Sequence, residues 1–459
     1  MIPNKNKILF IFALCGFLTP FIGSAINLAL PVIGDEFSIN IISLGWVVTI
    51  FFLSNAVFLV PFGRLADILG RRKIFLIGIL IFTLTSILCS LANSSLLLLT
   101  ARALQGLGSA MIFGTSTAIL VSIFQPRERG KALGLYATGV YVGFSVGPVL
   151  GGFITQYFGW RYIFVTAALL STVALVMSYM YIKDEWAHAK GENFDIKGSI
   201  LYAVSIVAML YGTSMLPCIS GYIVVISGIL TLVVFCFFEN SIKHPVFDID
   251  LLLKNRKFAM ANLAALFNFS AAAAVPFVLG IYLQYAKGLQ PNKAGFVMLI
   301  SAIAMILGSP IAGRLSDTKD QRIIASLGLA FSAIALLVMS FVLDINTSLY
   351  LLAFLLFLFG FGLSIFATPN THAAMESVTT RHLGIASSLL GTVRVFGQTM
   401  SMGITMLIFS LTIGKVKISK EVLPQLIQSS RIIFLILGLL CICGVFASLA
   451  RGKKREEKI

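Results

Sequence analysis

Fourteen long apolar runs, each long enough to cross a lipid bilayer as one helix, constrain this chain more than any other feature of its sequence. A helix that spans the hydrocarbon core of a bilayer needs about 20 mainly apolar residues. The runs cover roughly residues 8–30, 42–62, 74–92, 96–123, 131–154, 161–182, 196–216, 219–238, 258–283, 294–313, 323–343, 347–370, 384–411 and 430–450. Only a short PCIS turn separates the seventh run from the eighth, so a merger or loss of that pair would leave twelve spans.

The composition excludes an ordinary soluble domain. Of the 459 residues, 58% are hydrophobic and 11% are charged, whereas a soluble domain carries about 25% charged residues. The chain starts with a basic and then an apolar stretch, like a signal peptide, but no small-residue cleavage site follows, so we expect a retained first helix. The six cysteines fall within apolar runs without a metal-binding spacing, and we expect no metal and no cofactor.

The placement of the basic residues predicts the orientation of the chain. A net charge of +16 would suit a nucleic-acid partner, but the charges lie in loops between apolar runs, so we expect a lipid bilayer and no nucleic acid. An even number of spans puts both termini on one side. Of the 34 lysines and arginines, 25 fall on that side and 7 on the other. The positive-inside rule then places both termini in the cytoplasm.

The sequence contains an internal repeat. The stretch GRLADILGRR from Gly63 matches GRLSDTKDQR from Gly313 at an offset of 250 residues, and GLGSAMIF from Gly106 matches GFGLSIF from Gly360 at an offset of 254. Three identities follow at the second offset: Gly130 with Gly384, Ala132 with Ala386, and Gly143 with Gly397. We therefore expect two six-helix bundles, at residues 1–186 and 258–459, separated by two linker helices and a loop at residues 187–257.

The loop GRLADILGRRK joins the second and third spans on the predicted cytoplasmic side. Gly63 and Gly70 permit a tight turn. Asp67 lies close in sequence to Arg71 and Arg72, and these side chains can form charge-assisted hydrogen bonds. A basic loop that only sets the topology is the alternative.

The copy of this loop in the second half of the chain is altered. It keeps Asp317 and Arg322, but Asp320 stands where the first loop has its second glycine. We expect a weaker network of charges there for this reason.

Two arginines fall inside spans, where a charge is costly and usually faces a cavity or a partner. Arg102 lies near the start of the fourth span, and Gln105 follows three residues later on nearly the same helical face. The equivalent position in the second half is Leu356, so the helix architecture does not require this charge. Arg394 lies ~15 Å deep in the thirteenth span at 1.5 Å per residue. Snorkelling of Arg102 to the outer surface is the alternative.

The fifth span holds many helix-breaking residues, because GLYATGVYVGFSVGPVLGG contains six glycines and a proline. Glycine and proline cost about 1 and 3 kcal/mol in a helix interior. Gly139, Gly143, Gly147 and Gly151 recur every four residues and form a smooth stripe that lets another helix approach closely, while Pro148 bends the helix. We expect the stripe to contact a helix of the opposite half. Ordinary packing of small residues is the alternative.

Together with the repeat, these stretches resemble the major facilitator superfamily, and within it the fourteen-helix drug–proton antiporter group of the multidrug efflux type. The resemblance extends over essentially the whole chain. It implies an all-α polytopic membrane protein of the major facilitator fold, with two six-helix bundles plus two extra central helices. It also implies a monomeric secondary transporter, not an enzyme, that exports hydrophobic or amphiphilic compounds across the cytoplasmic (inner) membrane in exchange for protons, by alternating access.

The resemblance also assigns roles to residues. In the family, the loop from Gly63 latches the two halves in the outward-open state, and an arginine that matches Arg102 is associated with proton transfer. The first span ends in FIGSAINLALPVI, which resembles the family pattern around Asn27. We therefore expect Arg102, Gln105 and Asn27 to serve proton coupling. Six residues match the antiporter signature of the family: Gly134, Gly143, Gly147, Pro148, Gly151 and Gly152.

One departure from the family concerns acidic residues. The family commonly has an aspartate five residues before the asparagine of the first span, where this chain has Ile22. None of the 18 acids lies deep in a span by our boundaries, with Glu239 marginal. Proton-coupled carriers usually need a titrating group in the membrane, and His372 and Glu376, at the cytoplasmic end of the twelfth span, are the nearest alternatives.

The two arginines within spans favour a cargo that is neutral or anionic over a lipophilic cation. Satisfaction of both arginines by neighbouring carbonyl groups is the alternative. An apolar cavity with a few polar side chains suits such a cargo. We predict Arg394, Asn268 and Gln284 as cavity residues. Lipid contact of the side chains around the ninth span is the alternative. An anionic metabolite with different coupling, or a non-transporting membrane sensor on the same fold, also stays open.

Overall fold

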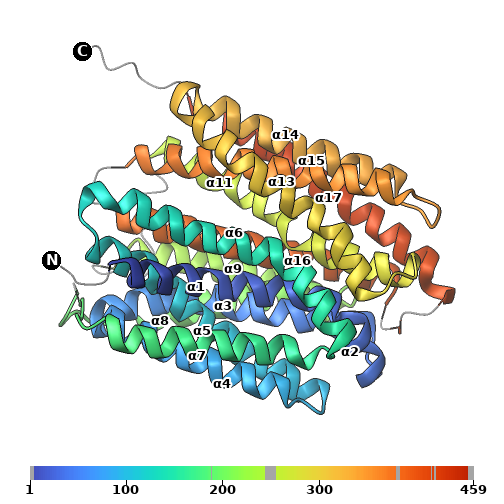
Figure 1. Ribbon diagram of the computed structural model, residues 1–459, viewed down its shortest axis with the longest axis horizontal. Helices are drawn as coiled ribbons and strands as arrows, with labels where there is room; N and C mark the ends of the chain where they lie inside the picture. The colour runs from blue at the N-terminus through green and yellow to red at the C-terminus, as the bar shows by residue number, and fades with distance from the viewer. Residues whose placement is uncertain are drawn as a thin grey trace.

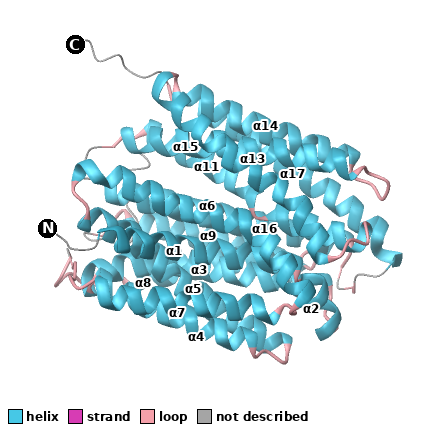
Figure 2. Ribbon diagram, viewed as in Figure 1, coloured by secondary structure: helices cyan, strands magenta, loops and turns pink. Residues whose placement is uncertain are grey.

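The computed structural model describes residues 5–187, 189–242, 255–378, 383–414, 416–417 and 420–452. These residues form helices and loops, with no strand among them (Figure 2). Among the described residues, fourteen helical segments are long and apolar enough to cross a membrane, which confirms the predicted number. The seventh and eighth runs are separate helices, α8 (Ile196–Met215) and α9 (Ile219–Glu239).

The remaining helices form two groups, which lie one above the other in Figure 1. We call the first group the first half: α1 (Lys5–Ala25), η1 (Ile26–Leu28), α2 (Leu30–Phe37), α3 (Ile41–Leu69), α4 (Arg71–Ser90), α5 (Ser95–Ile123), α6 (Pro126–Tyr157) and α7 (Arg161–Tyr181). The second half comprises α11 (Arg256–Ala272), α12 (Ala274–Ile281), η2 (Tyr282–Ala286), α13 (Pro291–Thr318), α14 (Gln321–Val342), α15 (Leu349–Glu376), α16 (Leu383–Thr412), η4 (Lys420–Val422) and α17 (Leu423–Leu449).

Side-chain caps start several of these helices. Asn40 accepts a hydrogen bond from the backbone of Ser43 at 2.9 Å where α3 begins, and Ser94 accepts one from Leu97 at 3.3 Å where α5 begins. Such caps satisfy backbone donors that have no partner within the helix. Gly70 separates α3 from α4 with φ +117°, a conformation that side-chain-bearing residues rarely adopt.

The two halves repeat the same helix contacts. Gly106 of α5 lies against the carbonyl group of Phe51 in α3, and Gly360 of α15 lies against that of Ser301 in α13. The glycines are 254 residues apart and their partners 250, which are the two offsets of the sequence repeat. Two further contacts recur: Gly108 on Gly78 with Gly362 on Gly328, and Gly143 on Phe17 with Gly397 on Leu266. The repeated glycines therefore mark positions where two helix backbones touch.

The first span of each half is broken, although the sequence predicts one continuous helix for each. A 3₁₀ segment, η1, separates α1 from α2, and the π-helical η2 follows α12. The broken segments meet, because a Cβ atom on Gly280 would lie 3.0 Å from the carbonyl oxygen of Asn27. Gln284 donates from Nε2 to the carbonyl oxygens of Leu28 at 3.2 Å and Gly280 at 3.0 Å. Irregular turns leave carbonyl groups without regular helical donors, and Gln284 supplies one.

The two halves touch at several places, and one set of these contacts lies near one end of the bundle. We call this end, which carries α2, the far end, and the end that carries Arg71 and Arg72 the basic end (Figure 1). Near the far end, Gly152 lies against Pro291 and Gly295 against Pro148. Ile41 also donates its backbone N–H to Val416 at 3.2 Å. We call this set of contacts the seam; it joins the two halves near the far end.

The linker region contacts both halves. Tyr202 of α8 donates its hydroxyl proton to the carbonyl oxygen of Ala56 in α3 at 3.1 Å. At the other end of the linker, Ser410 of α16 donates to the carbonyl oxygen of Leu216. Helix α9 packs on α8 and exposes large apolar side chains such as Ile223 and Phe237. This exposed face matches what lipid contact requires.

Candidate functional site

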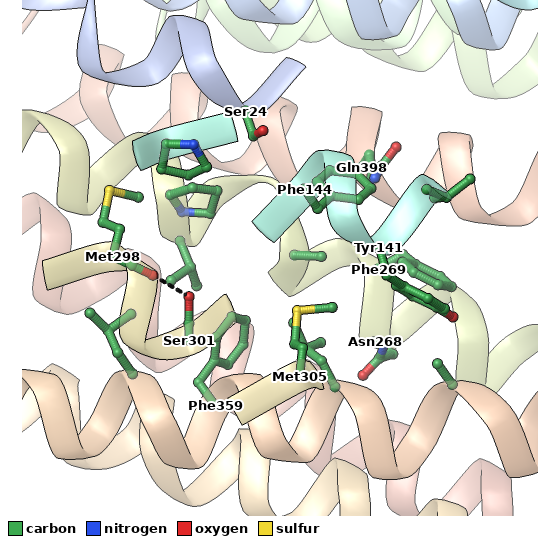
Figure 3. Close-up of a pocket in the computed structure, with 18 of the residues that line it drawn as sticks. Ser24, Tyr141, Phe144, Asn268, Phe269, Met298, Ser301, Met305, Phe359 and Gln398 are labelled. Carbon is green, nitrogen blue, oxygen red and sulfur yellow. Dashed lines mark hydrogen bonds between the residues drawn. The ribbon is translucent and has the colours of Figure 1, made fainter. Parts of the chain in front are cut away.

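A cavity lies between the halves, lined by α1 and α6 on one side and by α11, α12, α13, α15 and α16 on the other (Figure 3). Its empty space, counted out to its open side, is about 800 Å³. Aromatic rings and methionine side chains form most of the wall, namely those of Tyr141, Phe144, Phe269, Met298, Met305 and Phe359. Such a wall suits a large apolar or aromatic compound.

Three polar side chains in the cavity wall carry buried atoms without a hydrogen-bond partner in the described part of the chain. These atoms are Oδ1 of Asn268, Nε2 of Gln398 and Nε of Arg394. Asn268 is 1% exposed and Gln398 4%. The guanidinium group of Arg394 lies 4.9 Å from the ring centre of Phe269. A buried polar atom without a partner costs about 1–3 kcal/mol, so a bound compound that supplies partners would be favoured.

The structure brings together two of the three predicted cavity residues. Arg394 and Asn268 line the cavity, but Gln284 does not. Its placement there was wrong, because its side chain binds backbone carbonyl groups of the seam. Gln398 also lines the cavity and was not predicted, although it follows Arg394 by four residues and therefore shares its helix face. That spacing was the available signal.

Arg102 lies away from the cavity, in the interior of the first half, and is fully buried rather than extended to the surface. It donates from Nε to the carbonyl oxygen of Val47 at 3.1 Å and from Nη1 to Oε1 of Gln105 at 2.7 Å. Gln105 in turn donates to the hydroxyl oxygen of Ser86 at 2.8 Å. The arginine lies over the ring of Phe51 at 4.3 Å. This network connects α5 to α3 and α4.

Asn27, the third residue expected in proton coupling, lies in η1 beside the seam. Its Nδ2 donates to the carbonyl oxygens of Gly23 at 3.3 Å and Ser24 at 3.2 Å. The amide therefore stabilises the end of α1, and the neighbouring Ser24 is the residue that reaches the cavity wall.

The profile of the Major Facilitator Superfamily matches residues 12–402 and 261–458, which together cover most of the chain. The chain belongs to the major facilitator superfamily. It is thus a multi-pass membrane transporter rather than an enzyme, and its two bundles with extra central helices have the fold of that superfamily.

Characterised members of the superfamily align over most of this chain. The riboflavin transporter RibZ of Clostridioides difficile (strain 630) is 32% identical over 393 residues, which are 85% of each chain. The multidrug resistance protein Stp of Mycobacterium tuberculosis (strain ATCC 25618 / H37Rv) is 29% identical over 87% of this chain and 75% of its own length. The methylenomycin A resistance protein of Bacillus subtilis (strain 168) is 26% identical over 88% of each chain.

The fold also matches solved structures at low sequence identity. The human organic anion transporter MFSD10 (TETRAN) gives a TM-score of 0.66 at 13% identity, over 97% of this chain and 100% of that one. A bacterial homolog of the human lysosomal transporter Spinster gives 0.67 at 15% identity, over 98% of both chains. These similarities concern the fold alone.

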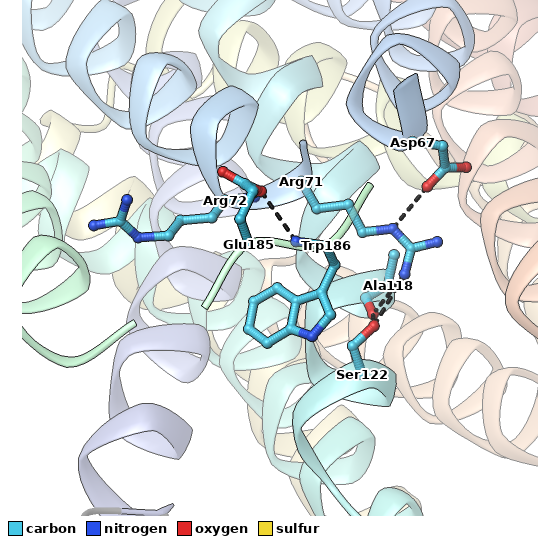
Figure 4. Close-up of polar contacts among 7 residues, drawn as sticks. All are labelled: Asp67, Arg71, Arg72, Ala118, Ser122, Glu185 and Trp186. Carbon is cyan, nitrogen blue, oxygen red and sulfur yellow. Dashed lines mark hydrogen bonds and ion pairs between the residues drawn. The ribbon is translucent and has the colours of Figure 1, made fainter. Parts of the chain in front are cut away.

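The loop between α3 and α4 of this major facilitator protein forms the predicted network of charges (Figure 4). Arg71 donates from Nε to Oδ1 of Asp67 at 2.7 Å. Its Nη1 reaches the hydroxyl oxygen of Ser122 at 3.0 Å and the carbonyl oxygen of Ala118 at 3.3 Å, both in α5. The described partners of this pair belong to the first half and to the segment after α7, so the family's latch between the halves stays a prediction.

Glu185 caps the start of α4 from that same segment. It accepts hydrogen bonds from the backbone of Arg72 at 2.8 Å and of Lys73 at 3.1 Å. The side chain of Arg72 donates to the carbonyl oxygen of Ile182. A Cβ atom on Gly70 would lie 2.5 Å from the Glu185 side chain. Both this lack of space and the positive φ angle therefore require glycine at position 70.

The copy of the loop in the second half is built differently. Asp320 caps α14, with Oδ1 accepting from the backbone N–H of Arg322 at 2.9 Å, and the two side chains are 3.4 Å apart. The side chain of Asp317 lies outside the described part. Gln321 stands where the first loop has Arg71, and at 2.7 Å its Nε2 meets Nδ1 of His372.

The titratable pair of α15 lies at this second loop. Gln321 also donates to Oε2 of Glu376 at 3.2 Å, and His372 lies 3.7 Å from Oε1 of Glu376. Positions 372 and 376 match Ala118 and Ser122 at the repeat offset of 254. In the first half, the charged Arg71 binds the neutral groups of Ala118 and Ser122. In the second half, the neutral amide of Gln321 instead contacts the ionisable side chains of His372 and Glu376.

The glycine stripe of α6 packs against α1, within the same half. Gly139, Gly143, Gly147 and Gly151 lie against Ala13, Phe17, Ser24 and Ala25, respectively. The prediction that the stripe contacts the opposite half is therefore wrong. Gly152 does face the opposite half, because one residue further along a helix is rotated by about 100°. Gly134, also part of the antiporter signature, has open space where a Cβ atom would stand.

Proposed function

We propose that this major facilitator protein exports hydrophobic or amphiphilic compounds across the cytoplasmic membrane by alternating access, in exchange for protons, with both termini in the cytoplasm. The observation that carries the proposal is the cavity between the halves, because its wall is apolar and aromatic with a few unpartnered polar atoms. The seam joins the two halves beside it, since Pro148 both lines the cavity and contacts Gly295. The drug-resistance proteins named among the relatives support the same class of cargo.

The cargo is neutral or anionic in this proposal. Arg394 is the only charged residue of the described cavity wall, and the wall contains no acidic side chain there to hold a cation. Arg102 does not contribute, since it is fully buried and does not line the cavity. The 32% identity to a riboflavin transporter favours one particular uncharged candidate, a riboflavin-like ring compound.

Coupling to protons requires a group that changes charge as the halves move. His372 and Glu376, which contact each other and Gln321 near the basic end, are the groups we propose. Histidine is the residue whose charge most often changes near neutral pH. Arg102 and Gln105 bind each other and Val47 and Ser86 inside the first half, which supports a stabilising role for them in addition to the predicted coupling role.

The test is reconstitution in liposomes with an imposed pH gradient and a panel of cationic, neutral and anionic amphiphiles that includes riboflavin. We expect movement of neutral and anionic compounds that accelerates with the gradient. Transport at a rate independent of the pH gradient would contradict the proposed exchange for protons. Transport restricted to lipophilic cations would contradict the proposed preference for neutral and anionic compounds. Labelling of the tail after Leu449 in sealed vesicles reports the orientation of the chain.

A further inference from the structure

We infer that the cavity recognises a flat, uncharged heteroaromatic ring through a lactam or imide edge, and that Asn268, Gln398 and Arg394 bind this edge. A lactam or imide edge is a ring N–H flanked by one or two carbonyl groups. The inference rests on the proposed transport function and names the class of cargo that the cavity selects.

The unpartnered atoms of the wall define what a ligand must carry. Nε of Arg394 and Nε2 of Gln398 are donors, so they need acceptors such as carbonyl oxygens. Oδ1 of Asn268 is an acceptor, so it needs an N–H or O–H group. A lactam or imide places both kinds of group side by side on one rigid ring. A quaternary ammonium ion without oxygen groups carries no acceptor for the two donors, and any cation meets the positive charge of Arg394.

The shape of the wall suits a flat ring. Asn268 is followed by Phe269 in α11, and Tyr141, Phe144 and Gln398 line the same cavity (Figure 3). Aromatic faces and methionine side chains around these amides can stack on a planar ring without further hydrogen bonds. The polar atoms can then fix the orientation of the ring edge.

Location distinguishes these polar atoms from other buried amides. Asn27 and Asn55 also keep an Oδ1 atom without a partner in the described part. Neither of them lines the cavity, and Asn55 donates to the hydroxyl oxygen of Ser109 at 2.8 Å. Asn268, Gln398 and Arg394 come from α11 and α16, two neighbouring helices, and line the same cavity. Three such atoms in one space indicate a common ligand.

The test compares riboflavin with N3-methylriboflavin for binding to the purified full-length protein. The two compounds differ in the ring N–H of the imide edge. We expect the methyl compound to bind at least about tenfold more weakly, because it leaves Oδ1 of Asn268 buried and unpaired. In Asn268→Leu the two compounds should bind alike. Asn268→Asp keeps an acceptor and should retain the preference, and Met305→Leu, an apolar change in the same wall, should retain it too.

The outcomes separate this inference from the proposed function. Equal binding of the two compounds to the unaltered protein, or a preference that survives in folded Asn268→Leu, would overturn the imide edge while export of amphiphiles stands. Binding of neither compound, in protein that still exports amphiphiles, would overturn it as well. Loss of all transport in liposomes would instead remove the proposed function. Thermal unfolding of each variant confirms that it is folded.

Discussion

Gly143 of α6 lies so close to Phe17 of α1 that a Cβ atom on the glycine would stand 2.5 Å from the carbonyl oxygen of Phe17. It is one of a row of contacts through which the glycine stripe of α6 packs on α1 within the same half. It also explains why glycine is needed there despite its cost of about 1 kcal/mol in a helix.

Gly143→Ala should destabilise the protein by about 1–3 kcal/mol, because the added methyl group forces α1 and α6 apart. Gly134→Ala is the matched control in the same helix, since nothing lies within 4 Å of the added atom. That control should be neutral or slightly stabilising. Thermal unfolding in detergent measures both, and equal effects of the two substitutions would contradict the assigned packing.

Gln105→Leu should cost about 1–3 kcal/mol, because it removes the acceptor of the buried Arg102 Nη1 donor and leaves that donor without a partner. Arg102→Met should also destabilise, through the loss of its bonds to Val47 and Gln105. Their double variant should lose less stability than the sum of the two single losses. A double-mutant cycle by thermal unfolding tests this, and strictly additive losses would mean that the two side chains are not coupled.

Glu36→Gln should weaken the attachment of α2 at neutral pH. Arg161 donates to Oε1 of Glu36 at 2.6 Å, and Trp160 donates to Oε2 at 2.7 Å. These hydrogen bonds, the one from Arg161 above all, hold the pKa of Glu36 below its ordinary value, against the opposing effect of burial. Ionised Glu36 should stabilise the folded state by less than about 1 kcal/mol, because both partners of the ion pair are partly exposed. Glu36→Gln should remove this gain in stability.

The pH dependence of this gain has a definite sign. A carboxyl group whose pKa is lower in the folded state stabilises that state above its unfolded pKa of about 4.3 and loses this effect as the pH falls through its folded pKa. The difference in unfolding temperature between the unaltered protein and Glu36→Gln should therefore be constant near pH 7 and shrink below pH ~4.3. A difference that grows in acid would contradict the assignment.

A disulfide across the seam should stop transport. A Cβ atom on Gly295 would lie 3.3 Å from Cα of Val149 in the opposite half, which is within reach of a disulfide. In a background that lacks the six native cysteines, Val149→Cys with Gly295→Cys should lose transport in liposomes after oxidation and regain it after reduction. Each single cysteine variant is the control. Full transport by the cross-linked protein would show that the seam does not open.

Sequence patterns predicted the spans and the repeat correctly. Apolar runs of bilayer length predict helices wherever they occur, since a spanning backbone must satisfy its own hydrogen bonds. The offsets of 250 and 254 predicted equivalent helices, and the contacts of Gly106 on Phe51 and Gly360 on Ser301 occur at those offsets. The network of Asp67 and Arg71 was also predictable, because its members lie within one short loop.

Partners that are distant in sequence were not predictable. The four-residue spacing of the glycines defined a smooth face on α6 but not the helix that covers it, so α1 was missed. Asn268 and Arg394 were predicted for the cavity as separate residues, whereas their common space with Gln398 depends on how α11 and α16 pack.

The sequence by itself thus determined the number of spans, the duplicated halves and the helix faces, because length, hydropathy and helical period are local properties. Only the tertiary structure decided that Arg102 is buried against Val47, that Gln284 binds the seam and that three unpartnered polar atoms belong to the wall of one cavity. These depend on which helix faces meet in three dimensions, and the periodicity of a single helix does not encode its neighbour.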